Sequence, residues 1–407
     1  MAAARPAPRL GPRPLPLHLM AAGAVWTSSH LASAMSRNGS LAWRPELAPA
    51  AAELEASLRN VAPESFARAL DGEIVARSEA MLRGIERYRH HSYRRPAEEP
   101  PVLWQEGSTR LLDYGPRDGV PVLAVPSLIN KAYVLDLLPE VSLLRHLSGA
   151  GVRPLLVDWG KPGEAEHDFG LDHYIAGRLE RAAEAAVANA GRKLAVLGYC
   201  MGGLLAVALA QRRPDLVSAL ALLATPWDFH AERAEQARLL GRLAGPLVES
   251  FAGLGEVPVD VLQMFFLAND PLTAARKFIN LTGLEAGSDA ERRFVALEDW
   301  LNDGVPLAIG VAADSLGPWY GDNTPGQGKW RVAGRPVLPE EVEAPSIVLV
   351  PRQDKIVPPL TAAALADHLI DVTRIDPPLG HIGMVVGHGA RAAVWEPLSA
   401  WLREHAR

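Results

Sequence analysis

The stretch of sequence that decides the fold reads Leu194-Ala195-Val196-Leu197-Gly198-Tyr199-Cys200-Met201-Gly202-Gly203. Its first half is a short, continuous apolar run of the kind that forms a fully buried strand, and the residues that follow have the pattern of a helix. Between them, the spacing Gly-x-Cys-x-Gly predicts a sharp turn with Cys200 at the head of that helix. The helix dipole and the free N–H groups at this end favour a nucleophilic thiolate. The alternative interpretation is a structural cysteine buried in a tight turn.

Two later segments offer the partners that a nucleophile needs. Asp354 follows a predicted strand over 346–350, so it lies at the edge of a sheet where active sites of open α/β sheets form. His381 lies in a loop with glycines on both sides, after a predicted strand over 372–375 and before the last helix. We expect His381 to be the base and Asp354 to orient it. The alternatives are that Asp354 caps the next helix and that His388 is the base.

A negatively charged intermediate at Cys200 would need two backbone N–H donors, the arrangement known as an oxyanion hole. One donor is expected from Met201, the residue after the nucleophile, and one from the loop that follows an early strand. That loop starts at Pro126, and within it Ile129 and Asn130 are the candidates. Asn130 has a second interpretation, in which its side chain caps the following turn.

Apolar runs alternate with helical patterns over most of the chain, which is typical of a mostly parallel sheet with helices on both faces. Strands are predicted over 102–105, 109–114, 120–125, 152–157, 193–197, 216–224, 346–350 and 372–375. Helices are predicted over 18–36, 47–60, 65–91, 139–149, 172–190, 201–212, 360–370 and 388–404. With the order nucleophile, acid, base, this pattern predicts an α/β-hydrolase fold.

The same pattern divides the chain. Residues 1–100 are predicted to be an N-terminal helical region whose first 15 residues, rich in Pro, Arg and Ala, are disordered. Residues 101–407 are predicted to be the catalytic domain. Over 230–344 the alternation stops and the sequence is helical in pattern, which predicts a cap inserted above the active site. Its aromatic residues, such as Trp227, Phe229, Trp319 and Trp330, either line a substrate pocket or form the core of the cap.

Composition limits the possible partners and compartments. The 407 residues carry a formal net charge of -6, which gives no basic surface for nucleic acid. Cys200 is the single cysteine, so we expect no disulfide within the chain and no multi-cysteine metal site. We also expect no cofactor. The apolar stretch Leu15 to Trp26 after several arginines has some features of a signal peptide. His18 interrupts it, however, and we expect neither a signal peptide nor a membrane-spanning helix.

From about residue 65 to the C-terminus, the sequence resembles the polyhydroxyalkanoate synthases. The stretches that carry the resemblance are 126–131 with 133–137, Val157-Asp158-Trp159-Gly160, 198–203 and Gly380-His381-Ile382-Gly383. Weaker likenesses to the cap of that family lie at 299–304, 323–324 and 332–334. The cysteine in the turn is the specific feature, since most hydrolases of this fold use serine. The sequence departs from the family at Lys355, where those synthases often have histidine.

The resemblance implies an acyltransferase that polymerises 3-hydroxyacyl-CoA into polyester and releases CoA. It implies that Cys200 carries the growing chain, that His381 activates Cys200 and the incoming hydroxyl, and that Asp354 orients His381. It also implies a cytoplasmic enzyme at the surface of polymer granules, working as a homodimer or with a second synthase subunit. Two other hypotheses stay open: a thioesterase, esterase or polyester depolymerase with a cysteine nucleophile, and a granule protein without activity.

Overall fold

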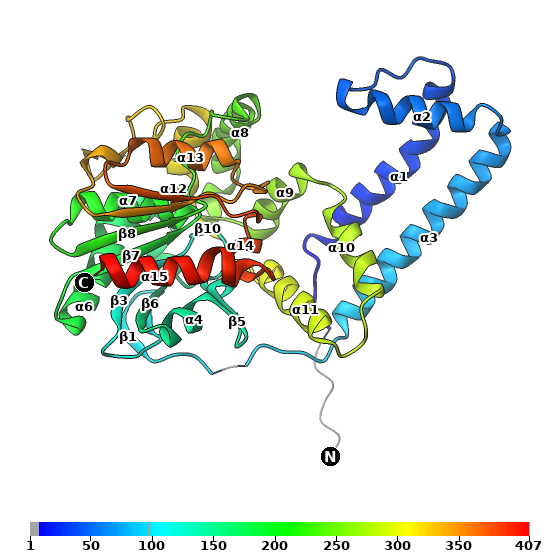
Figure 1. Cartoon of the computed structure of the whole chain (residues 1–407). Helices are drawn as coiled ribbons and strands as arrows, with labels where there is room; N and C mark the ends of the chain where they lie inside the picture. The colour runs from blue at the N-terminus through cyan, green and yellow to red at the C-terminus, as the bar shows by residue number, and fades with distance from the viewer. Residues whose placement is uncertain (1–7, 97, 407) are drawn as a thin grey trace. The chain divides into compact units, whose positions relative to one another are not determined.

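The computed structural model describes residues 8–96 and 98–406, and the chain divides into two compact units (Figure 1). The first, which we call the helical unit, comprises the residues up to Arg94 together with Gln263–Asn302. The second, the sheet unit, comprises Arg95–Leu262 and Asp303–Arg407. Each unit has a hydrophobic core of its own.

An eight-stranded sheet forms the centre of the sheet unit, in the order β1-β2-β6-β3-β7-β8-β13-β14. The strands are β1 (Val102–Glu106), β2 (Thr109–Asp113), β3 (Val120–Val125), β6 (Val152–Asp158), β7 (Leu194–Tyr199), β8 (Val217–Leu223), β13 (Ser346–Leu349) and β14 (Val372–Ile375). β2 pairs antiparallel with β1 and with β6, and every other pair is parallel. All residues of β7 and β13 are buried, because both faces of a parallel sheet are covered.

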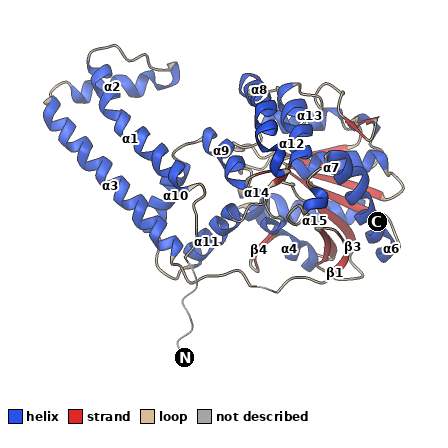
Figure 2. Ribbon diagram, turned by 180° about the vertical axis from the view of Figure 1, so that it is seen from behind, coloured by secondary structure: helices blue, strands red, loops and turns tan. Residues whose placement is uncertain are grey.

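Helices lie on both sides of the strands (Figure 2). One group that contacts the sheet contains α4 (Leu143–Gly149), the π-helix η8 (Arg391–Trp395) and α15 (Glu396–His405), and α15 crosses the face of the sheet turned to the viewer in Figure 1. Another group contains the π-helix η4 (Tyr174–Leu179), α6 (Glu180–Ala190) and α7 (Met201–Arg212). Because β7 pairs with β3 on one side and β8 on the other, α7 starts from the middle of the sheet.

The remaining elements of the sheet unit are short or belong to the insertion. The helices are η2 (Ala132–Leu135), η3 (Glu164–Glu166), α5 (Leu171–His173), α8 (Ala234–Phe251), η5 (Ala252–Leu254), α12 (Ile309–Ser315), the π-helix η6 (Leu316–Gly321), η7 (Pro339–Glu341), α13 (Pro359–His368) and α14 (Gly383–Val386). Three two-stranded ribbons are formed by β4 (Asp136–Leu138) with β5 (Val141–Ser142), β9 (Glu256–Val257) with β10 (Leu307–Ala308), and β11 (Arg331–Val332) with β12 (Arg335–Pro336). Helix α9 (Val259–Asn269) runs from the sheet unit into the helical unit.

The helical unit packs helices from two distant parts of the sequence. Its N-terminal helices are α1 (Leu15–Arg37), η1 (Pro45–Leu47), α2 (Ala48–Leu58) and α3 (Pro63–Arg89), and α10 (Thr273–Thr282) and α11 (Asp289–Asn302) come from the insertion. Their shared core contains Trp26, Met81, Ile85, Tyr88 and Phe278. The Arg87 guanidinium fixes the joint between α10 and α11, because it donates to the Leu281 and Leu284 carbonyls and to Glu291.

The insertion therefore differs from the predicted cap over 230–344. Residues 263–302 belong with α1 and α3 instead of with the elements that adjoin the sheet, and the helical unit ends at Arg94 where the predicted region ended at residue 100. Periodicity shows which face of a helix is apolar, but it does not show which other apolar face covers it. Only two-residue strands occur among the described residues of 230–344, in line with the absence of a buried strand from its pattern.

The predicted disorder over 1–15 falls in part on residues 1–7, which lie outside the described residues. Within the described part, Arg9 is held in the helical unit. Its guanidinium donates to the Tyr88 and His91 carbonyls and pairs with Asp299. Across the described chain, we find no helix that combines the length and the apolar character needed to span a bilayer.

Candidate active site

The turn between β7 and α7 holds Cys200 in a conformation that few side-chain-bearing residues adopt. Cys200 has φ 56° and ψ -129°, and its N–H donates to the Leu223 carbonyl of β8 at 2.9 Å. A backbone of this kind costs of order 1–3 kcal/mol and persists only where the surrounding structure enforces it. The turn therefore places a partly buried thiol at the carboxyl end of a central strand and at the N-terminus of a twelve-residue helix.

Two glycines make this turn possible. A Cβ on Gly202 would overlap the carbonyl oxygen of Val125 at the end of β3, and a Cβ on Gly198 would overlap the Cα of Gly203. The backbones of β3, β7 and α7 approach too closely here for any side chain. The Gly-x-Cys-x-Gly spacing thus reflects close backbone packing around the nucleophile position.

Asp354 and His381 meet beside this turn. Asp354 lies in the loop after β13 and His381 in the loop after β14, and His381 Nδ1 is 2.7 Å from Asp354 Oδ2. The other carboxylate oxygen of Asp354 accepts the N–H groups of Ile356 and Val357 at 2.8 and 2.9 Å. Asp354 is 4% exposed and His381 is 7% exposed. The carboxylate is thus held in place by its own loop and fixes the imidazole with Nδ1 toward Asp354.

The electrostatics of His381 link it to Cys200. Burial by itself lowers the pKa of His381, but the charge on Cys200, hydrogen bonds to Asp354 and Cys200, and the charge on Asp354 outweigh it. Together these groups raise the pKa of His381 from 6.5 to about 10. A protonated imidazole next to a thiolate can donate its proton to a departing group, and the neutral imidazole can accept one from an attacking hydroxyl.

Neither alternative describes the structure. Asp354 accepts the N–H groups of Ile356 and Val357, which precede α13, while the N-cap of α13 is Pro358 and has no side-chain cap. His388 is exposed, in a turn between α14 and η8. The structure therefore brings Cys200, Asp354 and His381 together and leaves His388 at the surface.

Two tyrosines at the site were not anticipated from the sequence. The Tyr199 hydroxyl donates to the His381 carbonyl at 3.2 Å, and its ring lies 5.2 Å from the imidazole. Burial, followed by the charges of Cys200 and Asp354, raises the pKa of Tyr199, so the hydroxyl stays a donor. Burial and the Cys200 charge raise the pKa of Tyr320, in η6 of the insertion, to about 12. Tyr199 is adjacent to Cys200 in the sequence, whereas nothing in the sequence around Tyr320 marked it.

The N–H groups of the candidate oxyanion donors differ in whether they already have an acceptor. Met201 is the first residue of α7, and the first N–H groups of a helix have no acceptor within the helix. The N–H of Ile129 is engaged, because it donates to Ser127 Oγ at 3.0 Å. Asn130 has a left-handed backbone, with φ 66°. The two loop candidates therefore differ, because the Ile129 N–H already has an acceptor and Asn130 has a left-handed backbone.

Residues 126–137, which we call the oxyanion loop, are fastened to the sheet at their start. The indole N–H of Trp159 donates to the Pro126 carbonyl at 3.0 Å. This contact joins two of the stretches that suggested a family, one following β3 and one following β6. Trp159 is buried, so its role is to hold the loop beside the Cys200 turn.

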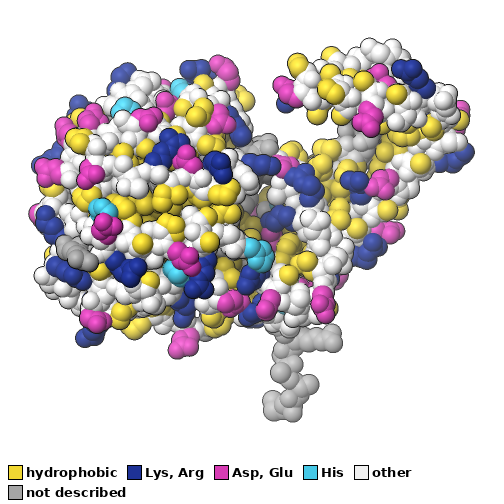
Figure 3. All heavy atoms as spheres, in the orientation of Figure 1, with side chains coloured by type: hydrophobic (Ala, Val, Ile, Leu, Met, Phe, Trp, Pro, Cys, Tyr) yellow, Lys and Arg dark blue, Asp and Glu magenta, His cyan; other side chains and the backbone are white. Residues whose placement is uncertain are grey.

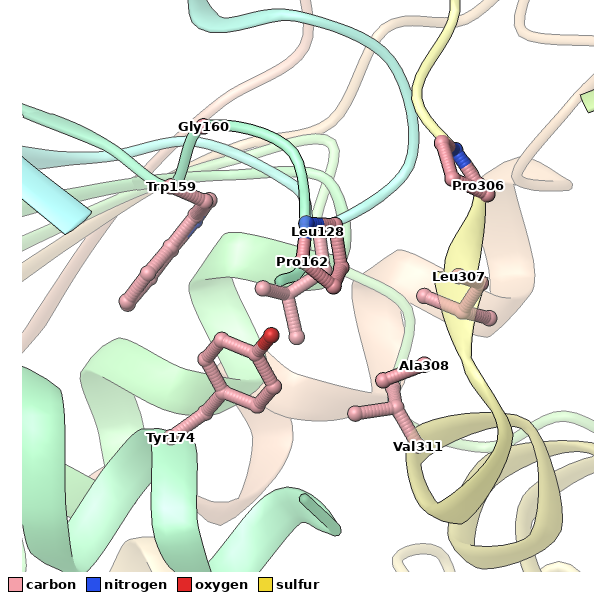
Figure 4. Close-up of a pocket in the computed structure, with 9 residues that line it drawn as sticks. All are labelled: Leu128, Trp159, Gly160, Pro162, Tyr174, Pro306, Leu307, Ala308 and Val311. Atoms are coloured by element: carbon pink, nitrogen blue, oxygen red, sulfur yellow. The ribbon is translucent and has the colours of Figure 1, made fainter. Parts of the chain in front are cut away.

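A small apolar cavity adjoins the oxyanion loop (Figure 4). It measures about 10 Å³, close to the room that one water molecule needs. Its walls are Leu128, Trp159, Gly160, Pro162, Tyr174, Pro306, Leu307, Ala308 and Val311. The Tyr174 hydroxyl is directed toward Leu128 in this view. None of Cys200, Asp354 and His381 lines the cavity, so we assign it no catalytic role.

Four aromatic residues, two just before the insertion and two within it, form a core. Trp319 lies with its ring centroid 5.4 Å from that of Trp330 and 6.0 Å from that of Phe229, and Trp227 lies 6.2 Å from Trp330. All four are buried, and none lines the cavity of Figure 4. Asn323 fastens this cluster, because its side chain bonds to the Phe229 N–H and to Asp228.

Comparison with known proteins agrees with this architecture. A family model described as the alpha/beta hydrolase fold matches residues 121–387. The poly(3-hydroxyalkanoate) polymerase subunit PhaC of Haloferax mediterranei is 28% identical over 318 residues, which are 75% of this chain and 64% of that protein. The subunit of the same name from Allochromatium vinosum is 28% identical over 70% of this chain and 81% of its own length. The Cupriavidus necator subunit is 29% identical over 71% of this chain and 51% of its own length.

The sheet order, the strained turn and the matched region define the class: the chain belongs to the α/β-hydrolase superfamily. The predicted fold, with a mostly parallel sheet and N-terminal helices, is confirmed. Within the superfamily, the curated relatives that match are named as poly(3-hydroxyalkanoate) polymerases, in agreement with the sequence resemblance to polyhydroxyalkanoate synthases.

Proposed function

We propose that this protein is an acyltransferase that polymerises 3-hydroxyacyl-CoA thioesters into polyester and releases CoA. The observation that carries the proposal is a cysteine, and not a serine, at the head of α7 beside a buried His–Asp pair, in a chain whose curated relatives are named as poly(3-hydroxyalkanoate) polymerases. A thiolate accepts an acyl group from a thioester with little change in energy, because one thioester replaces another.

The first step loads the enzyme. The Cys200 sulfur attacks the thioester carbonyl carbon, and the oxygen takes up negative charge that the N–H groups of Met201 and the oxyanion loop stabilise. The carbon–sulfur bond to CoA then breaks, and the departing sulfur takes the proton of the His381 imidazolium. The acyl group is now a thioester of Cys200, and His381 is neutral.

The second step forms the ester bond. Neutral His381 accepts the proton of the 3-hydroxyl of another hydroxyacyl-CoA, and the hydroxyl oxygen attacks the Cys200 thioester. The bond between the carbonyl carbon and Cys200 breaks, and the extended chain remains on CoA until Cys200 takes it back with release of CoA. Asp354 supports the imidazolium formed in this step.

Exclusion of water decides between this reaction and hydrolysis. Tyr320 interacts electrostatically with Cys200, which supports a role for the insertion in covering the thioester. If water reached the acyl-enzyme, the same triad would act as a thioesterase, esterase or depolymerase. That alternative uses the same acyl-enzyme as the proposal and differs from it only in the product that is released.

The exposed surface of α1 to α3 supports a proposal about what the enzyme contacts in the cell. The helices α1 to α3 carry exposed apolar side chains, visible in yellow in Figure 3, and they include Met20, Val25, Leu31, Leu54, Val75 and Leu82. Such side chains suit contact with a polyester granule or with a second subunit, either another copy or a different synthase subunit. We therefore propose an enzyme associated with the granule surface, in the cytoplasm, as the family resemblance implies.

The test uses purified protein and 3-hydroxybutyryl-CoA, with free CoA, free hydroxy acid and polymer followed separately. We expect CoA release to accompany polymer, and mass spectrometry of the quenched enzyme to show acyl adducts of several units on Cys200. Cys200→Ala should show neither adduct nor CoA release, and Cys200→Ser should be far slower than the wild type. Free hydroxy acid equal to the CoA released, with no adduct heavier than one acyl unit, would show a thioesterase.

A further inference from the structure

We propose that Arg95 and Asp303 are positioning residues that hold the oxyanion loop and thereby set the rate at which Cys200 is acylated. These are the first residues of the sheet unit at the two points where the chain enters it from the helical unit. Both contact the same short segment, residues 131–137. The inference rests on the proposed function in one respect: acyl transfer to Cys200 must pass through a negatively charged intermediate.

Arg95 binds the end of the oxyanion loop. Its guanidinium donates to the backbone carbonyls of Asp136 and Leu137 at 2.7 and 3.0 Å. The same group lies over the Tyr133 ring, 4.4 Å from its centroid. A planar guanidinium can bond to carbonyls and stack on a ring at once, which a lysine cannot do. Arg95 therefore fixes both the backbone and an aromatic side chain of the loop.

Asp303 contacts the middle of the oxyanion loop. One of its carboxylate oxygens is 2.8 Å from Lys131 Nζ, and the other accepts the Tyr133 hydroxyl at 3.4 Å. Lys131 follows Asn130, the candidate oxyanion donor with the left-handed backbone. Asp303 thus acts on the residue next to the one whose N–H must point at the intermediate.

The residue after Asp303 also packs beside the oxyanion loop. A Cβ on Gly304 would clash with the Val259 side chain and would lie 3.3 Å from Asn130 Oδ1. Gly304 therefore lies close to Asn130, at the start of the segment that Arg95 and Asp303 contact.

The inner side of the loop has further contacts besides those with Arg95 and Asp303, although Arg95 Nη2 also lies 3.7 Å from the buried Asp136 carboxylate. The buried carboxylate of Asp136 accepts Arg145 Nε at 2.7 Å and the Tyr114 hydroxyl at 3.1 Å. Leu128, Val134 and Leu135 are buried. Loss of Arg95 or Asp303 should therefore leave the loop folded and change the placement of its outer part. An oxyanion donor acts only within about 2.7–3.1 Å of the developing charge.

The experiment separates acylation of Cys200 from access to its sulfur, using the full chain. The variants are Arg95→Lys and Asp303→Asn, with Asp215→Asn as the matched control. Asp215 forms a comparable exposed ion pair with Arg213, but it precedes β8 at the opposite end of the sheet from Cys200. Acylation is measured as the 4-nitrophenol burst from 4-nitrophenyl acetate, and sulfur reactivity as the rate of alkylation by iodoacetamide, a displacement that forms no oxyanion.

We expect each variant to slow acylation by about 10- to 100-fold, the range for misplaced catalytic groups. Alkylation of Cys200 and Tm should stay close to those of the wild type, and Asp215→Asn should change none of the three. The exchange of charges in Lys131→Asp with Asp303→Lys should recover part of the acylation rate lost in Asp303→Asn.

Unchanged acylation in both variants would overturn the proposal. An equal fall in acylation and alkylation would also overturn it, because the residues would then act on the sulfur or on the fold. The probe is an activated ester and not a CoA thioester. A wild type that acylates with the ester but not with 3-hydroxybutyryl-CoA would thus count against the proposed function and leave the role of Arg95 and Asp303 testable.

Discussion

At the scale of single residues, the spacing of the residues around Cys200 predicted more of the candidate site than the amino-acid composition did. The Gly-x-Cys-x-Gly turn and the two later loops indicated which three side chains would meet, and the 2.7 Å contact between His381 and Asp354 brings two of them together. Ile129 could not be judged from sequence, because the acceptor of its N–H is the side chain of Ser127 in the same turn. Tyr320 could not be found either, since its electrostatic interaction with Cys200 depends on how the insertion folds.

The base assignment predicts unequal effects for two histidines. His381→Ala should lower CoA release by about 10²–10⁴-fold, the usual contribution of a general base. His388→Ala should change it little, because His388 is exposed and away from Asp354. The measurement is the initial rate of CoA release from 3-hydroxybutyryl-CoA. A large loss in His388→Ala with a small one in His381→Ala would reverse the assignment.

The raised pKa of His381 predicts a protonated ring at neutral pH. In the wild type, NMR of ¹⁵N-histidine-labelled protein should show the His381 imidazolium at pH 7.5 and its titration near pH 10. Cys200→Ala removes a charge and a hydrogen bond that raise this pKa, so the ring should titrate at lower pH. Because the folded pKa lies above 6.5, the stability that the protonated ring contributes is complete below pH 6.5 and is lost as the pH rises through about 10.

A neutral His381 at pH 7.5 in the wild type, or the same titration in both proteins, would contradict this description. The unfolding free energy gives an independent reading, since its decline between pH 7 and pH 10 should be steeper in the wild type than in Cys200→Ala.

At the scale of elements, buried strands were the most predictable part of the fold. β3 was predicted with its observed bounds, because a fully buried parallel strand is apolar throughout and ends where polar or turn residues begin. α7 was also predicted over its full length. The helix predicted over 139–149 starts later, at Leu143, since Val141–Ser142 form a strand and the Ser142 hydroxyl caps the helix by accepting the Arg145 N–H. A cap and a two-residue strand leave little trace in periodicity.

At the scale of the whole molecule, the division into units was the least predictable feature. α10 and α11 lie in the insertion, yet they share a core with α1 and α3, about two hundred residues earlier in the chain. Sequence pattern gives the amphipathic faces of all these helices but not their pairing. The core of the sheet unit, among the residues that the structure describes, is built from residues of that unit.

The exposed apolar residues of α1 lead to a prediction about attachment to polymer. Met20 and Leu31 are 67% and 66% exposed and lie outside the core of the helical unit, so Met20→Glu with Leu31→Glu should preserve the fold. Acylation of Cys200 by 4-nitrophenyl acetate should be unchanged, because neither residue belongs to the sheet unit. Co-sedimentation with polyhydroxybutyrate particles should fall several-fold, since two charges replace apolar side chains that would contact the polymer.

The matched control Glu73→Gln with Glu79→Gln alters exposed charged residues of α3 and should sediment like the wild type. Equal sedimentation of both double variants would mean that these residues do not attach the enzyme to granules, and loss of acylation in the α1 variant would mean that the helical unit takes part in catalysis.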